Sequence, residues 1–105
     1  MIWVAMRIIA QRNLHVFWSR HPETRLALVQ WAAVVRSADW RSIQDVVQAV
    51  GSAKALNGER VRFAICGGNY RLIVAFDFLR GVAYVKFLGT HAEYDRIDAL
   101  GVSQF

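Results

Sequence analysis

The sequence predicts an α+β fold in which helices come first and strands follow. Its 105 residues leave room for one domain, and 55% of them are hydrophobic, so the chain can bury a core of its own. Helical periodicity extends to about Ala53, and alternating strand periodicity follows it. Helices grouped before strands are typical of α+β proteins rather than of alternating α/β folds. We therefore expect residues 1–105 to form a single domain.

Three helices are expected in the first half of the chain, after a short strand at residues 6–10. The first is predicted by apolar side chains at the spacing of one helical face, namely Leu14, Phe17 and Trp18. Pro22 and Glu23 suit the start of the second, because the first turn needs no N–H there and its dipole favours a carboxylate. Ser42 and Asp45 resemble a capping box at the start of the third. The expected spans are 11–20, 22–37 and 42–51.

The second of these helices is apolar on nearly all sides from Leu26 to Val35, whereas a surface helix needs only one apolar stripe. One interpretation places it at the centre of the domain. The other leaves its second face as a groove or ridge for a protein partner.

Turn sequences divide the second half into an antiparallel meander. The turns are Asn57-Gly58, Gly67-Gly68-Asn69 and Arg80-Gly81. The three main strands are expected at residues 60–66, 70–78 and 82–88. We expect the helices to pack on one face of this sheet.

Alternation along the strands separates an apolar face from a basic one. The apolar set expected to face the helices is Val61, Phe63, Ile65, Tyr70, Leu72, Val74, Phe76, Phe78, Ala83, Val85 and Phe87. The open face then carries Arg60, Arg62, Arg71 and Lys86. Like charges on one face destabilise a sheet, and a phosphate backbone would relieve that repulsion. Alternatively, the arginine stems cover apolar surface while their heads stay solvated, with Asp77 as a partial partner.

The charge balance also favours a polyanionic partner. Thirteen Lys and Arg residues against eight Asp and Glu give a net charge of +5, and eleven of the thirteen are arginine. Arginine holds phosphate oxygens bidentately and stacks on bases, which favours RNA or DNA. A single cysteine excludes an internal disulfide and fits a reducing compartment. No apolar run approaches the length of a membrane span, so we expect a cytoplasmic protein without membrane contacts.

Ionisable groups are densest between Gly89 and Arg96. If this segment is helical, His91 and Asp95 lie one turn apart and can touch, which suits proton transfer. The alternative is a solvated terminal turn. A metal site at His91, Glu93 and Asp95 matches no established ligand spacing, and we expect neither a metal nor another cofactor.

The strings Tyr-Arg-Leu-Ile-Val at residues 70–74 and Phe-Leu-Gly-Thr-His-Ala-Glu-Tyr-Asp-Arg-Ile-Asp at residues 87–98 resemble the HigB family of bacterial toxins, within the RelE-like superfamily. Phe17-Trp18, His21-Pro22 and Ala38-Asp39-Trp40 occur in the same order in that family. The likeness covers roughly residues 6–98. Family chains commonly begin near Met6, so residues 1–5 are an upstream extension or an alternative start.

The resemblance implies a toxin that cleaves mRNA on the translating ribosome and is silenced by a cognate HigA-like antitoxin. Its fold would be a compact antiparallel sheet with helices on one face. The catalytic residues it implies are Arg71, His91, Tyr94 and Asp95. Some RelE-like relatives place several lysines around the scissile phosphate, and this chain offers only Lys54 and Lys86. With Arg60 and Arg62, these lysines are the expected RNA-binding residues.

RNA can be cut when its own 2′-hydroxyl attacks the adjacent phosphorus, provided that a base takes the proton and cations hold the developing charge. The resemblance leaves open whether His91 or Tyr94 is the general base. Two alternatives keep the fold. One is a non-catalytic module or a toxin with another target such as gyrase, acting with its antitoxin, and the other is a ribonuclease that does not need the ribosome.

Overall fold

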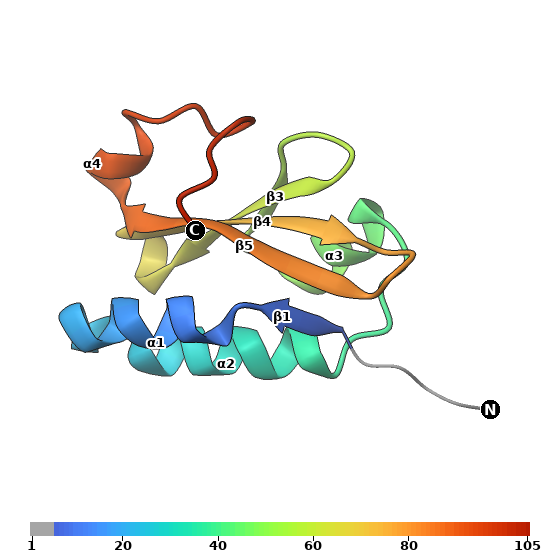
Figure 1. The fold of residues 1–105 in the computed structure, drawn as a ribbon, viewed down its shortest axis with the longest axis horizontal. Coiled ribbons are helices and arrows are strands. Elements are labelled where there is room, and N and C mark those ends of the chain that lie inside the picture. The colour runs from blue at the N-terminus through green and yellow to red at the C-terminus, as the bar shows by residue number, and fades with distance from the viewer. Residues whose placement is uncertain (1–5) are drawn as a thin grey trace.

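A five-stranded sheet in the order β1-β5-β4-β3-β2 carries two helices across one face (Figure 1). This computed structural model describes residues 6–105, and the predicted extension over residues 1–5 lies outside them. The elements in chain order are β1 (Arg7–Ile9), α1 (Gln11–Arg20), the short 3-10 helix η1 (Pro22–Thr24), α2 (Arg25–Arg36), α3 (Ile43–Ala49), β2 (Ala53–Ala55), β3 (Arg60–Ile65), the 3-10 helix η2 (Cys66–Gly68), β4 (Tyr70–Asp77), β5 (Val82–Thr90) and α4 (His91–Tyr94).

The predicted α+β class is confirmed, but the sheet is mixed rather than wholly antiparallel. Strands β2 to β5 form the predicted antiparallel meander. Strand β1 joins its far side parallel to β5, with Arg7 opposite Val82 and Ile9 opposite Tyr84. Periodicity alone does not reveal this pairing, because a three-residue strand carries no sign of its direction.

The three predicted helices are present, with differences at their starts. The second begins as η1 at Pro22, where the Thr24 hydroxyl donates to the His21 carbonyl at 2.7 Å, and continues as α2. At the start of α3, the Ser42 hydroxyl accepts from the Asp45 N–H at 3.2 Å. The Asp45 carboxylate accepts from the Arg41 N–H instead of returning to Ser42, so only half of the predicted capping box forms.

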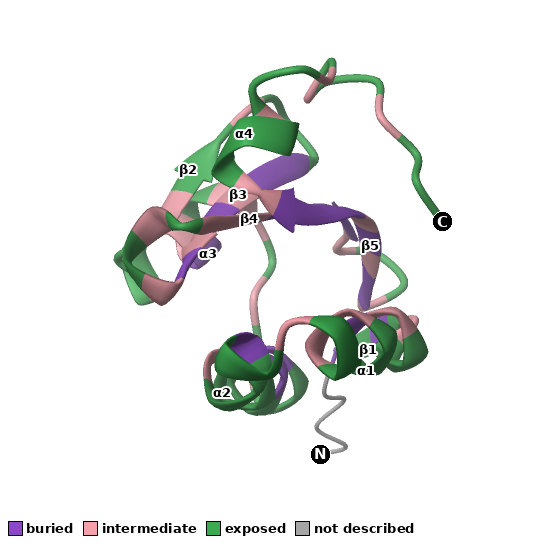
Figure 2. Ribbon diagram, turned by 90° about the vertical axis from the view of Figure 1, so that its left-hand side faces the viewer, coloured by how far each residue is buried: buried purple, intermediate pink, exposed green. Residues whose placement is uncertain are grey.

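Helix α2 lies at the surface, and its placement as a central helix is wrong. Its sheet-facing side is buried through Leu28, Trp31, Ala32 and Val35. Its outer side is exposed to solvent, as Figure 2 shows, and Leu26, Val29 and Val34 are 66%, 40% and 47% exposed. The second interpretation, an apolar ridge for a partner, stays a prediction.

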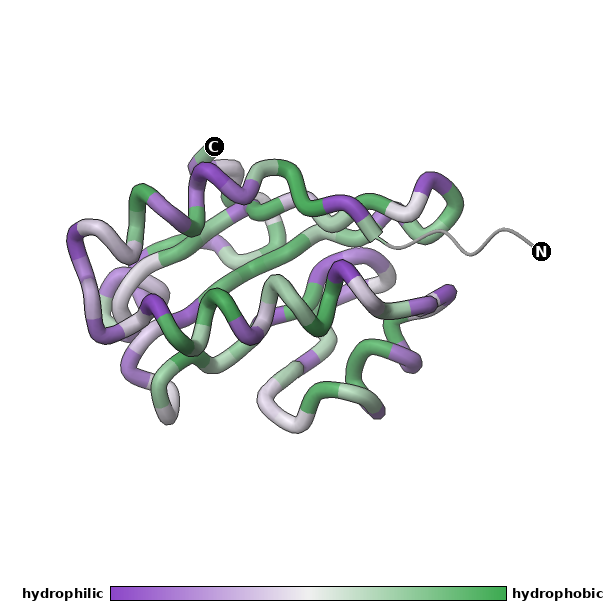
Figure 3. Tube along the Cα trace, turned by 90° about the horizontal axis from the view of Figure 1, so that it is seen from below, coloured by the Kyte–Doolittle hydropathy of each residue, from purple (hydrophilic) through white to green (hydrophobic). Residues whose placement is uncertain are grey.

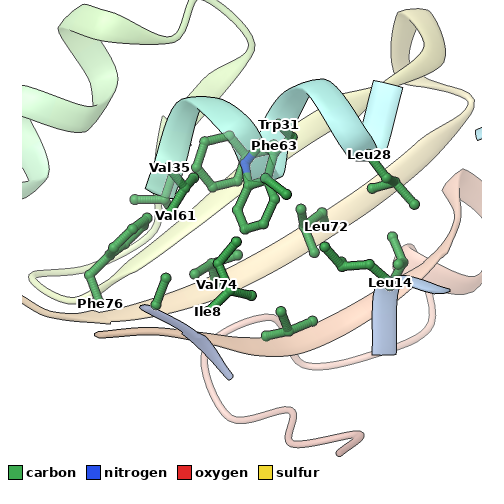
Figure 4. Close-up of a cluster of buried hydrophobic side chains, with 14 of the residues drawn as sticks. Ile8, Leu14, Leu28, Trp31, Val35, Val61, Phe63, Leu72, Val74 and Phe76 are labelled. Atoms are coloured by element: carbon green, nitrogen blue, oxygen red, sulfur yellow. The ribbon is translucent and has the colours of Figure 1, made fainter. Parts of the chain in front are cut away.

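The core lies between α1, α2 and the sheet. Phe63 packs edge-to-face against Trp31, with ring centroids 5.4 Å apart, and Leu14, Leu28 and Leu72 lie to one side of this pair (Figure 4). Seen from the helix side, the chain alternates between hydrophilic and hydrophobic along the helices, whereas long stretches of the sheet are hydrophobic (Figure 3). Between residues 6 and 105, no helix is both long and apolar enough to cross a bilayer.

A β-bulge in β5 changes which side chains face the helices. Ile73 lies opposite Phe87 while Val74 lies opposite Val85, so Lys86 has no partner across the ladder. One extra residue reverses the alternation beyond it. Leu88 therefore enters the core, and Phe87 turns to the open face. The predicted placement of Phe87 among the helix-facing residues is wrong for this reason.

The open face is partly covered from the other side. Helix α4 and the C-terminal tail, residues 96–105, lie on the side of the sheet away from α1 and α2 (Figures 1 and 2). The prediction that the N-terminal helices pack on one face holds for α1 and α2, and α4, which that prediction did not include, lies on the opposite face.

Candidate active site

Helix α4 is a single turn fixed at its start. The Thr90 hydroxyl accepts from the Glu93 N–H at 3.1 Å, and the Glu93 carboxylate accepts from the Thr90 N–H at 2.8 Å, which is a complete capping box. The His91 N–H donates to the Asn69 carbonyl at 2.9 Å. This last bond ties the start of α4 to the turn between β3 and β4, so these two segments lie side by side at the end of the sheet.

The predicted contact between His91 and Asp95 is present. His91 Nδ1 lies 3.0 Å from Asp95 Oδ2, and both side chains are about half exposed, at 52% and 58%. An ionised carboxylate only accepts hydrogen bonds, so the contact requires Nδ1 to carry the proton. In the neutral ring, Nε2 is then the nitrogen that carries no proton.

Arg71 lies near the start of β4, the central strand of the sheet, between Ala64 of β3 and Gly89 of β5. Its guanidinium carbon is 5.8 Å from the centroid of the Tyr94 ring, within the range of a cation–π contact. The guanidinium also lies near Gly68, where an added β-carbon would be 3.7 Å from Nη2, an ordinary contact distance. Gly67 and Gly68 have φ of +68° and +97°, so the turn itself favours glycine at both positions.

The Tyr94 ring packs against the ring of Phe87. The two ring centroids are 6.3 Å apart, and Phe87 is 4% exposed. The Phe87 ring lies over Gly89, where an added β-carbon would be only 2.7 Å from Cζ. The bulge that turns Phe87 to the open face therefore also places its ring in contact with Tyr94.

Further cations extend from Arg71 across the open face. Arg62 lies beside Lys54 of β2 and beside Ile73 of β4, which places it diagonally from Arg71. The Nε atoms of Arg62 and Arg71 are both buried, and neither has a hydrogen-bond partner within residues 6–105. Lys86, the bulge residue, holds its ammonium 5.5 Å over the Tyr84 ring.

Arg60 is not accessible on this face, contrary to prediction. It is only 8% exposed, and its Nη1 donates to the carbonyls of Ala99 at 3.1 Å and Val102 at 2.8 Å. The C-terminal tail covers it. The alternation of β3 places Arg60 on the correct face, but alternation does not show that another segment packs over it.

A second polar cluster lies on the helix side at the same end of the sheet. The Tyr70 hydroxyl donates to the Glu23 carboxylate, and the rings of His21 and Tyr70 are 5.4 Å apart. This hydrogen bond lowers the pKa of Glu23 and raises the pKa of Tyr70. The bond ties η1 to the first residue of β4, next to Arg71.

The residues of α4 and its surroundings that sequence reasoning missed are structural supports. They are Asn69, Phe87, Gly89, Thr90 and Glu93. A Thr followed three residues later by Glu is itself a capping-box signal, so this support was open to prediction. No signal in the sequence reveals the Asn69 carbonyl, because any residue supplies that group.

The metal hypothesis has no support from the geometry. Among the residues that the structure describes, no three His, Cys, Asp or Glu side chains gather as metal ligands. Glu93, one of the three residues considered for it, is occupied with the capping box. Cys66, the one cysteine in the sequence, lies partly buried where β3 ends, with Sγ 3.5 Å from the Glu23 carbonyl oxygen.

Comparison with known proteins assigns the family. A search of curated proteins gives no match. The model of the HigB toxin family, described as the RelE-like toxic component of a toxin-antitoxin system, matches residues 24–97. The match spans well over half of the chain and includes α2, the whole meander and α4. The chain therefore belongs to the HigB toxin family.

Proposed function

We propose that this toxin is an endoribonuclease that cleaves mRNA on the ribosome, with Arg71, His91, Tyr94 and Asp95 as its active site. The observation that supports it most is the meeting of three groups at one end of the open face. These are the His91–Asp95 pair, the Tyr94 ring and the Arg71 guanidinium. Together they supply a proton acceptor, a second proton carrier and a cation, which are the needs of RNA cleavage.

In the proposed reaction the RNA supplies its own nucleophile. The 2′-hydroxyl loses its proton to a base, its oxygen bonds to phosphorus, and the bond from phosphorus to the 5′-oxygen breaks. The leaving 5′-oxygen takes up a proton, which gives a 2′,3′-cyclic phosphate and a 5′-hydroxyl. His91 Nε2 and the Tyr94 hydroxyl are the two candidates for moving these protons, and Asp95 orients the His91 ring.

Cationic side chains would stabilise the negative charge that develops during cleavage. The transition state carries extra negative charge on the non-bridging oxygens, and Arg71, whose guanidinium lies 5.8 Å from the centroid of the Tyr94 ring, would hold that charge. Arg62, Lys54 and Lys86 would bind the neighbouring phosphates through the charged ends of their side chains. Arg60 is left out of this set because the tail covers it.

The test is transcript mapping after induction of the wild type and of His91→Ala. New 5′ ends that require ribosomes support the proposal. We expect His91→Ala to lower the cleavage rate by about 10²- to 10⁴-fold while RNA binding changes little. A substrate with 2′-deoxyribose at the cut position should bind and stay intact. Efficient cutting of that substrate, or an unchanged rate for His91→Ala, would contradict the mechanism.

Two other results would point to the alternatives. Cleavage of naked RNA at the same rate would mean a general ribonuclease. Binding to ribosomes or to another target without new transcript ends would mean a non-catalytic module. Both outcomes are separated from the proposal by the same assay with and without ribosomes.

Membership of this family implies an antitoxin partner. We propose that a HigA-like antitoxin contacts the apolar ridge on α2, formed by Leu26, Val29 and Val34, because these large apolar side chains are exposed within residues 6–105. Hydrogen exchange with antitoxin bound should show protection there. A footprint that spares residues 26–35 would count against this contact.

A further inference from the structure

The chain beyond α4 returns across the open face and is anchored at two points. Arg60 Nη1 donates to the carbonyls of Ala99 and Val102. At the other anchor, the Gln104 N–H donates to the Lys86 carbonyl at 2.9 Å, and the Gln104 side-chain oxygen accepts from the Leu88 N–H at 2.9 Å. The tail thus bridges β3 and β5 over the strand between them.

The Arg60 guanidinium is bound by backbone carbonyls alone. Within residues 6–105 it forms no ion pair with a carboxylate, although it is 8% exposed. A buried cation needs acceptors, and these two carbonyls are the ones it has. A turn closed by the Gly101 and Val102 N–H groups on the Asp98 carbonyl places the two carbonyls together around Nη1. The side chain therefore holds one defined conformation of the tail.

Arg60 is too far along the sheet to share a phosphate with Arg71. Arg71 lies opposite Ala64, which follows Arg60 by four residues on β3, or roughly 13 Å. An effect of Arg60 on the active site must therefore pass through the tail.

Helix α4 needs the support that the tail can give. A single helical turn is marginal by itself, because its few hydrogen bonds do not offset the cost of ordering it. The start of α4 is fixed by the capping box and by Asn69. Its end continues through Asp95, Arg96 and Ile97, whose N–H groups bond back to the turn, directly into the segment that Arg60 holds.

We propose that Arg60 is a positioning residue, which fixes the tail and thereby holds α4, with His91, Tyr94 and Asp95, against Arg71. Its effect on cleavage rests on the proposed function. Its effect on the order of α4 does not. Arg60 acts through two carbonyls and does not touch RNA.

The experiment compares Arg60→Met, which keeps most of the stem, with the matched charge control Arg80→Met. Arg80 is exposed at the turn between β4 and β5 and forms a surface ion pair with Asp77. For Arg60→Met we expect kcat for ribosome-dependent cleavage to fall about 10- to 100-fold, because the catalytic groups on α4 are displaced. KM should change by less than about twofold, because no contact with RNA is removed. Arg80→Met should leave both unchanged, and Arg60→Lys should recover part of kcat through one carbonyl.

Hydrogen exchange supplies a measurement that does not depend on cleavage. The N–H groups of Asp95, Arg96 and Ile97 should exchange faster in Arg60→Met than in the wild type or in Arg80→Met. Gln104→Ala loosens the tail from its other anchor without touching Arg60, so it should change both readouts in the same direction. It also keeps the test informative if Arg60→Met does not fold.

The outcomes separate the possible roles. A raised KM with unchanged kcat would make Arg60 an RNA contact and overturn the proposal. Faster exchange in the tail with unaltered exchange at residues 95–97 would also overturn it, because the tail would then not hold α4. If the wild type does not cleave RNA, the proposed function fails, whereas the exchange result still decides whether Arg60 holds α4.

Discussion

Replacing Gly89 with alanine should destabilise the protein, although alanine is ordinarily the better residue in an extended strand. The added β-carbon would lie 2.7 Å and 3.2 Å from two atoms of the Phe87 ring and 3.0 Å from Glu93 Oε1. Phe87 is only 4% exposed, and the Glu93 oxygen is the capping-box acceptor for the Thr90 N–H.

The magnitude follows from two opposing effects. Overpacking at a buried site costs about 1–3 kcal/mol, and loss of the cap about 1 kcal/mol more. Alanine also restricts the unfolded chain, which returns about 0.4–1 kcal/mol. The free energy of unfolding of Gly89→Ala should therefore fall by about 1–3.5 kcal/mol.

Urea denaturation of the purified toxin measures this, with Gly51→Ala as the matched control. Gly51 has no atom within 4 Å of an added β-carbon, so Gly51→Ala should leave stability unchanged or raise it slightly. The double variant Gly89→Ala, Phe87→Leu should lose less than the sum of the two single variants, since leucine lacks the ring atoms that clash. Equal stability of Gly89→Ala and the wild type would refute the argument.

Three further predictions concern other parts of the molecule. Asp95→Asn should keep the fold and lower cleavage by about 10²- to 10⁴-fold. The amide N–H can donate to Nδ1 of His91, which favours the tautomer with the proton on Nε2, so Nε2 can no longer accept one. An unchanged kcat would remove Asp95 from the mechanism. Ser42→Ala should lower the free energy of unfolding by about 1 kcal/mol through loss of the α3 cap, as measured in urea, and no loss would mean that the cap contributes nothing. The Tyr70–Glu23 bond should make stability depend on pH at both extremes. Folding lowers the pKa of Glu23 from about 4.5, so this stability is present above that pH and is lost as pH falls through the folded-state pKa. Folding raises the pKa of Tyr70 from about 10.0, so the same stability is present below that pH and is lost as pH rises through the folded-state pKa. For Tyr70→Phe, the free energy of unfolding should depend less on pH in both ranges. The same pH dependence in Tyr70→Phe and the wild type would contradict the assignment.

Most of the fold follows from local patterns in the sequence. The helix over residues 11–20 and the three long strands lie where their periodicity predicts them, within a few residues at the ends. The parallel pairing of β1 and the reversal of faces at Lys86 do not follow, because both depend on how distant strands align. A bulge is invisible to alternation until the partner strand is known.

The candidate site was predictable to the extent that it is local. His91 and Asp95 are four residues apart, so one helical turn was enough to bring them together. The contact of Arg71 with Tyr94 joins β4 to α4, and only the family resemblance pointed to it. The covering of Arg60 was beyond prediction, since the tail's hydrogen bonds use backbone carbonyls that every residue has.

The two hydrogen bonds of Gln104 also satisfy two backbone groups of β5, the Lys86 carbonyl and the Leu88 N–H. Strand β5 runs to Thr90, but β1 pairs with it only as far as Tyr84, which leaves the second half of that long strand with an open edge. Open edges recruit strands from other molecules. Gln104 occupies this one with its own backbone and side chain. A protease that trims the last few residues would therefore yield a toxin prone to aggregate, whatever its activity toward RNA.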